Sequence, residues 1–437
     1  MWPYHPELLS TPVPRYTSFP TAAEFGEGIG PLEMERALRE ASGELSLYVH
    51  IPFCEKICWY CGCNTGAANR YERLTTYLDA LHREMAMVGS LLGNGVRTRR
   101  IAFGGGSPNA ISPTELVRLV ISLTRHLPLV DPVWSIELDP RNLSQDWARA
   151  LGAIGFSHAS LGVQTFAAHL QEAIGRVQPD AEIVRATALL RDAGVTSLNF
   201  DLMYGLPGQT LVDLEQTLRR TVELGADRIA LFGYAHVPHI IPRQRRIDAT
   251  VLPGIAERFA MAALGYDLLT AAGYVAVGFD HFALPTDPLA QAAIRRRLHR
   301  NFQGFTDDKA SALIGFGASA ISCFPALVVQ NEKNSGRYGA TLAKGHLPAA
   351  LGLVRTPDDQ RTGRLIEMLL CQGEALLGPE LGQSMRNALE PFVAHGLAQL
   401  TGDRLRILPE GLPYARTIAA LFDPYRQHSP RRFSSAV

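Results

Sequence analysis

The sequence lacks an excess of charge of either sign and lacks any apolar stretch long enough to cross a membrane. Its 437 residues carry 42 Lys and Arg against 42 Asp and Glu, so the formal net charge is zero. This balance argues against a surface built to bind nucleic acid, which needs an excess of basic residues. No apolar run approaches the ~18 residues of a membrane-spanning helix, and Met1–Ser10 lacks the basic and apolar regions of a secretion signal. We therefore expect a soluble, cytoplasmic protein with no membrane span and no nucleic-acid partner.

Cysteine is scarce and unevenly placed. Four of the six cysteines, Cys54, Cys58, Cys61 and Cys63, fall within ten residues, and the other two stand alone. Disulfides are disfavoured in a reducing cytosol and would not crowd four sulfurs into one loop. The crowding therefore indicates metal ligation or a redox site. The composition, 46% hydrophobic and 19% charged, allows a large buried core and excludes a disordered chain.

Short β-rich runs alternate with longer amphipathic runs between residues 44 and 280. A strand–helix–strand repeat of about 35 residues predicts a parallel sheet with right-handed crossovers, and six such units form an open (β/α)6 barrel. Helices are predicted over Arg73–Leu92 and Thr114–Leu127, with a cap at Ser112, and Ala193-Gly194 is typical of a helix end. The predicted strands are Leu45–Ile51, Arg100–Phe103, Val133–Leu138, His158–Val163, Ser197–Leu202 and Arg228–Phe232.

An unusual motif follows each predicted strand. In barrels of alternating strands and helices, the chemistry gathers at the carboxyl ends of the strands. We therefore predict a single site to which all six units contribute. The motifs, in chain order, are the cysteine loop, Gly104-Gly-Gly-Ser-Pro108, Glu137-Leu-Asp-Pro140, Gly162-Val-Gln164, Asp201 and Tyr234-Ala-His236.

The two ends of the chain differ from its middle. We expect three parts: an N-terminal arm over residues 1–43, a barrel domain with an extension over residues 44–340, and a mainly helical C-terminal domain over residues 341–437. Within the last part, Phe392–Leu400 followed by Asp403–Leu408 predicts a helix leading into a wing-like hairpin. No basic stripe accompanies this hairpin, so nucleic-acid binding is not expected of it.

The spacing Cys54-x3-Cys58-x2-Cys61 places three thiolates on one short loop. Structural zinc usually takes two ligands from each of two separated knuckles, and no second knuckle is evident here. Three local cysteines are one short of a fully ligated four-iron cluster, so one iron stays open to a ligand. An open iron beside a reducible sulfonium is the arrangement that radical chemistry from S-adenosylmethionine (SAM) requires. The aromatic Tyr60 before the third cysteine agrees with a radical SAM cluster rather than zinc.

At this point the sequence resembles a known family over nearly its whole length. The segment Tyr48–Cys63 is similar to the cluster loop of the oxygen-independent coproporphyrinogen III oxidases (dehydrogenases) of haem biosynthesis. Five further segments carry the same resemblance. They are Pro14-Arg-Tyr-Thr-Ser-Phe-Pro-Thr21, Ser135-Ile-Glu-Leu-Asp-Pro140, Asp201-Leu-Met-Tyr-Gly-Leu-Pro207, His299-Arg-Asn-Phe-Gln-Gly304 and Gly317-Ala-Ser-Ala-Ile-Ser322.

The resemblance implies a three-quarter, TIM-like open (β/α)6 barrel with an N-terminal arm over the site and a C-terminal helical domain. It also implies one [4Fe–4S] cluster ligated by Cys54, Cys58 and Cys61, together with two molecules of SAM. Cys63 matches a family cysteine that is not a ligand, and a fourth thiolate would close the open iron.

Eleven further positions match the family's SAM-binding residues. Glu137 can accept hydrogen bonds from both ribose hydroxyls, and Arg176 offers a planar fork to a carboxylate. For the SAM on the cluster, the resemblance implies Tyr48, Tyr60, Gly105, Glu137 and Ile321. For the second SAM, it implies Gly106, Ser107, Gln164, Arg176, Asp201 and Ala235.

Three positions depart from the family pattern. Ser107 replaces Thr and keeps the hydroxyl, and Trp59-Tyr60 replaces Tyr-Phe and keeps the aromatic ring. Gly233 replaces an expected Asn before Tyr234, which removes a polar side chain near the expected second SAM.

The implied reaction converts two propionates of coproporphyrinogen III into vinyl groups with loss of two CO2, giving protoporphyrinogen IX. A 5′-deoxyadenosyl radical, formed from SAM by the reduced cluster, would take a β-hydrogen from a propionate. Loss of CO2 would then expel an electron to an acceptor that the sequence does not identify. The implied partners are the substrate and an electron donor such as flavodoxin or ferredoxin, and we expect a monomer. Because the substrate carries four carboxylates, Arg15 and the run Arg295–Arg300 are candidates for binding it.

The alternative is a haem chaperone of the same superfamily. The related chaperones share the cluster loop but bind and deliver haem. In them we expect an apolar residue after the third cysteine and no Pro-Arg-Tyr-Thr-Ser arm. Cys63, the arm and Arg176 favour the oxidase.

Overall fold

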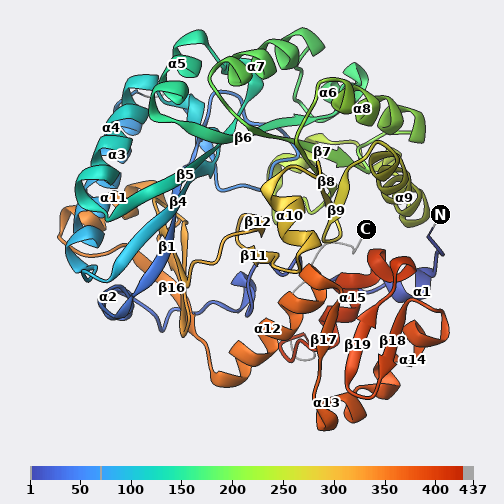
Figure 1. Ribbon diagram of the computed structural model, residues 1–437. Coiled ribbons are helices and arrows are strands. Elements are labelled where there is room, and N and C mark those ends of the chain that lie inside the picture. The colour runs from blue at the N-terminus through green and yellow to red at the C-terminus, as the bar shows by residue number, and fades with distance from the viewer. Residues whose placement is uncertain (1, 69–70, 427–437) are drawn as a thin grey trace.

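The computed structural model describes residues 2–68 and 71–426. Its centre is a twelve-stranded sheet of order β16-β15-β14-β13-β1-β4-β5-β6-β7-β8-β10-β9, which curls into an open barrel with helices on its outside (Figure 1). The strands are β1 Gly43–Ile51, β2 Phe53–Cys54, β3 Gly66–Ala67, β4 Val96–Gly105, β5 Leu129–Leu138, β6 Phe156–Gln164, β7 Ser197–Tyr204, β8 Arg228–Gly233, β9 Val275–Val277, β10 His281–Ala283, β11 His299–Asn301, β12 Gly304–Thr306, β13 Ala312–Phe316, β14 Ile321–Phe324, β15 Leu327–Asn331, β16 Ala349–Val354, β17 Glu374–Leu376, β18 Ala398–Thr401 and β19 Arg404–Ile407.

The helices cover the outer face of this sheet and build the C-terminal region (Figure 1). They are α1 Pro6–Leu9, α2 Pro31–Glu40, α3 Tyr71–Leu91, α4 Pro113–His126, α5 Gln145–Ile154, α6 Ala168–Ala173, α7 Asp180–Asp192, α8 Leu211–Glu223, α9 Ile255–Ala271, α10 Pro288–Ile294, α11 Ser335–Ala343, α12 Pro357–Gln372, α13 Pro379–Ser384, α14 Arg386–Ala394 and α15 Ala415–Ala420.

Six parallel strands form one part of the sheet, and they follow one another in chain order: β1, β4, β5, β6, β7 and β8. All six strands predicted from the sequence are confirmed. Residues 45–51 are buried almost without interruption, as expected of a parallel strand covered on both faces. The sequence did not predict the extension of the sheet beyond β1, where β13 is parallel and β14, β15 and β16 are antiparallel.

The helix signals predicted from the sequence are also present. Ser112 caps α4, since its hydroxyl accepts a hydrogen bond from the Glu115 amide at 3.2 Å. Helix α7 ends at Asp192, and Gly194 follows at φ +88°, a backbone conformation that glycine adopts without strain. These local signals determine where the connecting helices begin and end, and therefore where the strands between them can lie.

The first residues of the chain pack into the C-terminal region rather than standing apart from it. Leu9, Tyr16 and Phe19 share a buried cluster with Leu389 of α14 and Ile418 of α15. The Tyr16 hydroxyl donates to Asp423 at 3.0 Å. The segment after α1 thus runs between the C-terminal region and the barrel.

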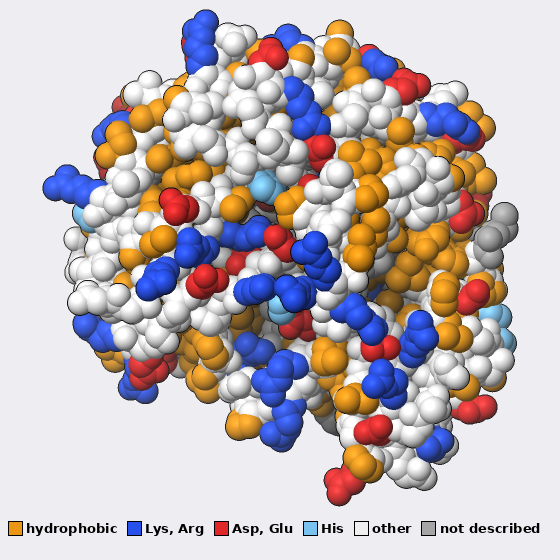
Figure 2. All heavy atoms as spheres, in the orientation of Figure 1, with side chains coloured by type: hydrophobic (Ala, Val, Ile, Leu, Met, Phe, Trp, Pro, Cys, Tyr) orange, Lys and Arg blue, Asp and Glu red, His pale blue; other side chains and the backbone are white. Residues whose placement is uncertain are grey.

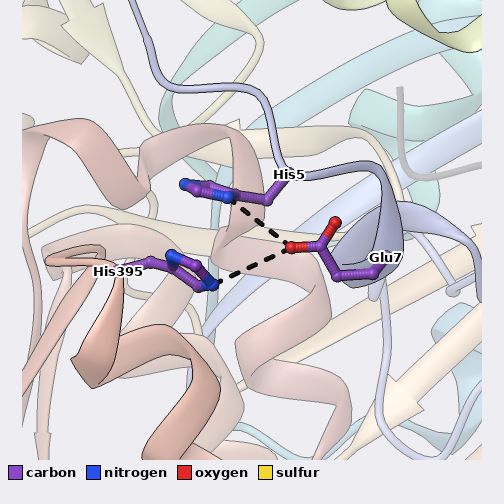
Figure 3. Close-up of side chains that lie close together, drawn as sticks. All are labelled: His5, Glu7 and His395. Atoms are coloured by element: carbon purple, nitrogen blue, oxygen red, sulfur yellow. Dashed lines mark ion pairs between the residues drawn. The ribbon is translucent and has the colours of Figure 1, made fainter.

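A small polar cluster joins α1 to α14 at the surface. Figure 3 shows the His5 and His395 rings next to each other, both directed at the same oxygen of the Glu7 carboxylate. Glu7 Oε1 lies 3.6 Å from His5 Nδ1 and 3.8 Å from His395 Nε2, and the two rings stack with centroids 3.9 Å apart. The His5 amide also donates to the Tyr414 hydroxyl at 2.8 Å, which adds a hydrogen bond to the apolar packing of the arm.

The predicted helix Phe392–Leu400 is wrong in its second half. Helix α14 ends at Ala394, Gly396 takes φ +69°, and Ala398–Thr401 forms β18. The glycine reverses the chain, so the residues after it pair with β19 in the hairpin that the sequence predicted. The domain limits stay a prediction, although the main sheet itself continues past residue 340 to Val354. No helix within the described residues is both long enough and apolar enough for a membrane span.

Candidate functional site

The cysteine loop lies at the carboxyl end of β1, as predicted. Short strands β2 and β3 pair at its base, and the Trp59 amide donates to the Ile174 carbonyl at 3.1 Å. A Cβ on Gly175, which has φ +65°, would lie 2.6 Å from the Trp59 ring. The loop is therefore packed closely against the turn between α6 and α7, which fixes the positions of its thiols.

Cys54, Cys58 and Cys61 line one cavity. Cys58 is buried, and the other two are partly exposed to that cavity. Across residues 2–68 and 71–426, the His, Cys, Asp and Glu groups compact enough to surround a single ion do not include these thiols. A four-iron cluster holds each thiolate on a different iron, so its ligands lie further apart than those of one zinc ion. The donor set therefore fits a cluster better than a mononuclear metal.

Two guanidinium groups point at the Cys58 sulfur. Arg176 Nη1 lies 3.2 Å from Cys58 Sγ and Arg141 Nη2 lies 3.7 Å from it. Asp139 pairs with both cations, at 2.6 Å from Arg141 and 3.5 Å from Arg176. Although burial alone would raise its pKa, Arg176 and Arg141 hold the Asp139 pKa below the usual range. Cationic donors of this kind stabilise a thiolate, the form that ligates iron.

Sequence reasoning placed the motif Glu137–Pro140, which contains Asp139, at the shared site but gave Asp139 no role, and it missed Arg141. Nothing in the residue types of this motif indicated a contact with Cys58. The connection is made by the fold, because β5 and β1 end at the same edge of the sheet with β4 between them.

Each residue of the Gly104–Gly106 run lacks space for a side chain. A Cβ on Gly104 would lie 2.6 Å from the Glu137 carboxylate, and one on Gly106 would lie 2.5 Å from the Phe53 carbonyl oxygen. Gly105 takes φ +112°, and its amide donates to Glu137 Oε2 at 3.1 Å. The run therefore exposes bare backbone beside the Glu137 carboxylate, a surface suited to the amino-acid end of a ligand.

Tyr48, Glu137 and Ile321 line one cavity, and Gly105 joins Tyr48 and Glu137 around the neighbouring one. Burial raises the pKa of Glu137 to about 7. It also lowers the pKa of His50, which lies 3.2 Å from the Tyr48 hydroxyl, to about 4. The structure thus brings together four of the five residues assigned to the SAM on the cluster.

Tyr60, the fifth of these, lies in the cavity of the cysteines. The residues assigned to the second SAM line that same cavity, with one exception: they are Gly106, Ser107, Gln164, Arg176 and Asp201. Ala235 does not line it. Gln244 Nε2 donates both to the Ala235 carbonyl at 3.0 Å and to the Tyr60 carbonyl at 2.9 Å, so Ala235 is linked to the site through Tyr60.

Asp201 and Gln164 show features of a binding site rather than of a packed core. Burial raises the pKa of Asp201, whose two oxygens accept hydrogen bonds from Ser160 at 2.9 Å and Asn199 at 2.8 Å. Gln164 has φ +66°, a strained conformation for a residue with a side chain. The Asp201 carboxylate is therefore held in place by two side chains of the fold.

Arg176 lines the cavity of the cysteines, but its N–H groups already have acceptors within the protein. They are directed at Cys58 Sγ, at the Gly162 carbonyl 2.7 Å away and at Gln178 Oε1 3.0 Å away. The guanidinium therefore supports the cluster loop as well as facing the cavity.

Gly233 lies beside Arg258 and Tyr204, and its relation to a second SAM stays a prediction. A Cβ at this position would lie 3.1 Å from Arg258 Nη2 and 3.1 Å from the Tyr204 hydroxyl. Its carbonyl accepts a hydrogen bond from Arg15 of the arm at 3.1 Å. The missing side chain thus opens space beside Arg258 and Arg15, and Gly233 is not among the residues that line the cavity of the cysteines.

This combination of fold and site defines a radical SAM enzyme, and the profile of the Radical SAM superfamily matches residues 48–221. Two relatives identify the family to which the chain belongs within this superfamily. The chain is 38% identical to an oxygen-independent coproporphyrinogen III oxidase of Bradyrhizobium diazoefficiens, over 97% of both chains. It is also 38% identical to an anaerobic coproporphyrinogen III oxidase of Cereibacter sphaeroides, over 97% of this chain and 96% of the relative.

A solved structure agrees with these relatives. Coproporphyrinogen III oxidase from Escherichia coli, described as a radical SAM enzyme, superposes with a TM-score of 0.90 at 34% identity. The match covers 97% of this chain and 99% of the other. The chain belongs to the family of oxygen-independent coproporphyrinogen III oxidases.

Gly105→Ala tests whether the glycine run receives SAM. The new Cβ would lie 2.4 Å from the His50 ring at a backbone φ of +112°, so the loop must move. We expect SAM affinity to fall roughly tenfold or more while the cluster is retained. Equilibrium binding of labelled SAM under anaerobic conditions measures this. Gly93→Ala is the matched control, because nothing lies within 4 Å of its Cβ position. Equal affinity in the two variants would contradict a role for the run in SAM binding.

Proposed function

We propose that the protein removes two carboxylates from coproporphyrinogen III and converts the two propionates into vinyl groups, giving protoporphyrinogen IX. The observation that carries this proposal is the arrangement of cavities. Glu137 and Asp201 line both the cavity of the cysteines and a central cavity that is also lined by Phe232, His281 and Phe305. The two carboxylates thus lie where the cofactor region meets a space for a substrate.

When bound, a [4Fe–4S] cluster and SAM supply an electron and a 5′-deoxyadenosyl radical able to take hydrogen from an unactivated C–H bond. The residues of the chain then have three tasks: to ligate the cluster, to hold SAM and to close the site. Cys54, Cys58 and Cys61 ligate the iron, and Arg141 and Arg176 stabilise the Cys58 thiolate. The glycine run and Glu137 hold the amino-acid and ribose parts of SAM.

The arm has the third task, which is to close the site. Arg300 donates to the carbonyls of Tyr16 at 3.0 Å and of Arg15 at 2.9 Å, which holds the arm over the barrel. The side chains of Tyr16 and Phe19 on the arm are buried against the C-terminal region. A closed site keeps water and oxygen away from a radical.

We propose a second SAM beside the first, in the cavity lined by Ser107, Gln164 and Asp201. Three observations support it: the strained backbone at Gln164, the buried Asp201 carboxylate, and the separation of these residues from Tyr48 and Ile321, which line another cavity. A low-potential one-electron donor such as flavodoxin or ferredoxin is proposed to reduce the cluster. We further propose that the protein acts as a cytoplasmic monomer.

Asp201→Ala tests the second SAM. Loss of a charge-assisted acceptor in a buried site costs roughly 1.5–3 kcal/mol. We therefore expect the protein to bind two SAM, and the variant to bind one of them at least about tenfold more weakly. Labelled SAM at equilibrium with the anaerobic holoprotein measures both stoichiometry and affinity. Asp192→Ala, at an exposed position on α7, is the matched control. One SAM per chain, bound alike by all three proteins, would exclude the second site.

A haem chaperone of the same superfamily is the alternative. The names of the relatives reported above favour the oxidase. The anaerobic protein with coproporphyrinogen III, SAM and a reductant should form vinyl products. Tight binding of haem without any vinyl product would instead support the chaperone.

A further inference from the structure

Three metal-ligating side chains from the two ends of the chain meet at the surface. His5 and Glu7 belong to the arm, and His395 directly follows α14 in the C-terminal region. One donor atom from each lies within 4.8 Å of the donor atoms of the other two. Histidine side chains are visible at the right-hand edge of the face in Figure 2, on the side where Figure 1 places α1. We call these three residues the His–Glu–His cluster.

The spacing of the donor atoms is close to that around a tetrahedral zinc ion. Glu7 Oε1 lies 3.6 Å from His5 Nδ1 and 3.8 Å from His395 Nε2. Both rings are directed at this one oxygen (Figure 3). Bonds of about 2.0–2.1 Å at tetrahedral angles place neighbouring ligand atoms roughly 3.3–3.4 Å apart. Small side-chain rotations therefore suffice to bring all three donors onto one ion.

The backbone around the cluster is held by contacts that do not involve the three side chains. The His5 amide donates to the Tyr414 hydroxyl at 2.8 Å, and that hydroxyl donates to the Pro3 carbonyl at 2.8 Å. Leu9, the last residue of α1, is buried among residues of the C-terminal region, which fixes α1 there. His395 is the C-cap of α14. Ligands on a fixed backbone lose little conformational freedom when they bind an ion, which favours affinity.

An ion pair alone does not account for the convergence of three such groups. The side chains of Glu7 and His395 are 58% and 41% exposed, and exposed ion pairs contribute little to stability. His169 and Asp213 form an ordinary pair of this kind, 3.5 Å apart, and no third donor among the described residues lies close enough to share an ion with them. The exposure of the His–Glu–His cluster also leaves an open path for an ion and a coordination position for water.

We propose that His5, Glu7 and His395 bind a divalent transition-metal ion, with Zn²⁺ the best match, and that this ion ties the arm to the C-terminal region. Two imidazoles and one carboxylate suit Zn²⁺ rather than Mg²⁺ or Ca²⁺, which take oxygen ligands. The ion adds to the apolar packing of Tyr16 and Phe19 of the arm. Because opening of the arm then requires loss of the ion, bound Zn²⁺ stabilises the closed arm by mass action.

Equilibrium dialysis with radioactive zinc measures the binding. The protein is the tag-free, anaerobic holoprotein, in which the iron–sulfur cluster occupies its ligand cysteines. We expect one Zn²⁺ per chain at this site, not displaced by excess Mg²⁺. His5→Ala, Glu7→Gln and His395→Ala should each weaken this binding roughly tenfold or more. His169→Ala is the matched control, because it removes an exposed histidine beside a carboxylate but no proposed ligand, and it should bind Zn²⁺ like the unmodified protein.

Hydrogen exchange of the arm tests whether the ion ties it down. Saturating Zn²⁺ should slow the exchange of amides in residues 5–20 of the unmodified protein roughly tenfold or more. It should leave their exchange unchanged in His395→Ala, whose substitution lies outside the arm. Exchange of the arm unaffected by bound Zn²⁺ in the unmodified protein would overturn the tie between the arm and the C-terminal region.

The binding data can also contradict the site itself. The absence of bound Zn²⁺ from the unmodified protein would overturn it, as would equally tight binding by His5→Ala and His395→Ala. A loss of affinity in His169→Ala as large as in His395→Ala would show adventitious binding to surface histidines and would overturn the site as well. The site does not depend on the proposed function, whose failure would be seen separately as absence of vinyl product.

Discussion

Replacing Cys54, Cys58 or Cys61 with Ala is expected to abolish iron binding and turnover together. Each thiol is the only protein ligand of one iron in the proposed cluster, so its loss leaves that iron without an anchor. The three side chains line one cavity, and Cys58 is additionally held by Arg141 and Arg176. Iron and sulfide analysis, with the visible absorption of the reconstituted protein, measures the loss.

Cys63→Ala is the matched control for this experiment. Cys63 lies two residues beyond the last ligand, and its amide donates to Cys61 Sγ at 3.4 Å. Because Cys63 is not a proposed ligand of the cluster and its backbone contact remains, the substitution should keep the iron and the brown colour. If Cys63→Ala lost iron as fully as Cys58→Ala, the open coordination position of the cluster would be wrongly assigned.

Arg176→Ala should lower turnover by roughly a hundredfold or more, since two effects combine. The substitution removes a cation 3.2 Å from Cys58 Sγ, which stabilises the more negative, reduced cluster. We expect the midpoint potential to fall by roughly 50–100 mV, the equivalent of one charge-assisted hydrogen bond. It also removes the one arginine that, within residues 2–68 and 71–426, lines the cavity of the cysteines, so we expect the second SAM to bind at least about tenfold more weakly.

A redox titration followed by electron paramagnetic resonance, and SAM binding at equilibrium, measure these two effects separately. Arg185→Ala is the matched control, because Arg185 donates to the Leu143 carbonyl at 2.9 Å and does not contact the cysteine loop. An unchanged potential would show that the contact with Cys58 has no effect on the cluster. Unchanged binding of both SAM molecules would remove Arg176 from the second site.

Much of the fold and of the cluster loop could be predicted because their signals are local. The alternation of β-rich and amphipathic runs located all six parallel strands, and the cap at Ser112 and the stop at Gly194 lie within a few residues of the ends that they determine. The predicted helix over Phe392–Leu400 was wrong in its second half. The prediction followed the pattern of apolar residues and gave too little weight to Gly396, whose left-handed backbone ends the helix.

The rest of the site depends on contacts between residues far apart in the sequence. Arg141 reaches Cys58 because β5 and β1 end at the same edge of the sheet. Gly233 lies beside Tyr204 because the two residues are paired in the register of β7 and β8, and its Cβ position also lies near Arg258. Contacts of this kind are set by tertiary packing rather than by local pattern.

One measurement tests the central claim most directly. Coproporphyrinogen III carrying deuterium at the β-carbons of its propionates is incubated with the reduced, reconstituted protein and SAM in the absence of oxygen. The account predicts protoporphyrinogen IX, two CO2 for each porphyrinogen consumed, and deuterium in the 5′-deoxyadenosine. Cleavage of SAM without deuterium in the 5′-deoxyadenosine, or release of CO2 without vinyl groups, would contradict it.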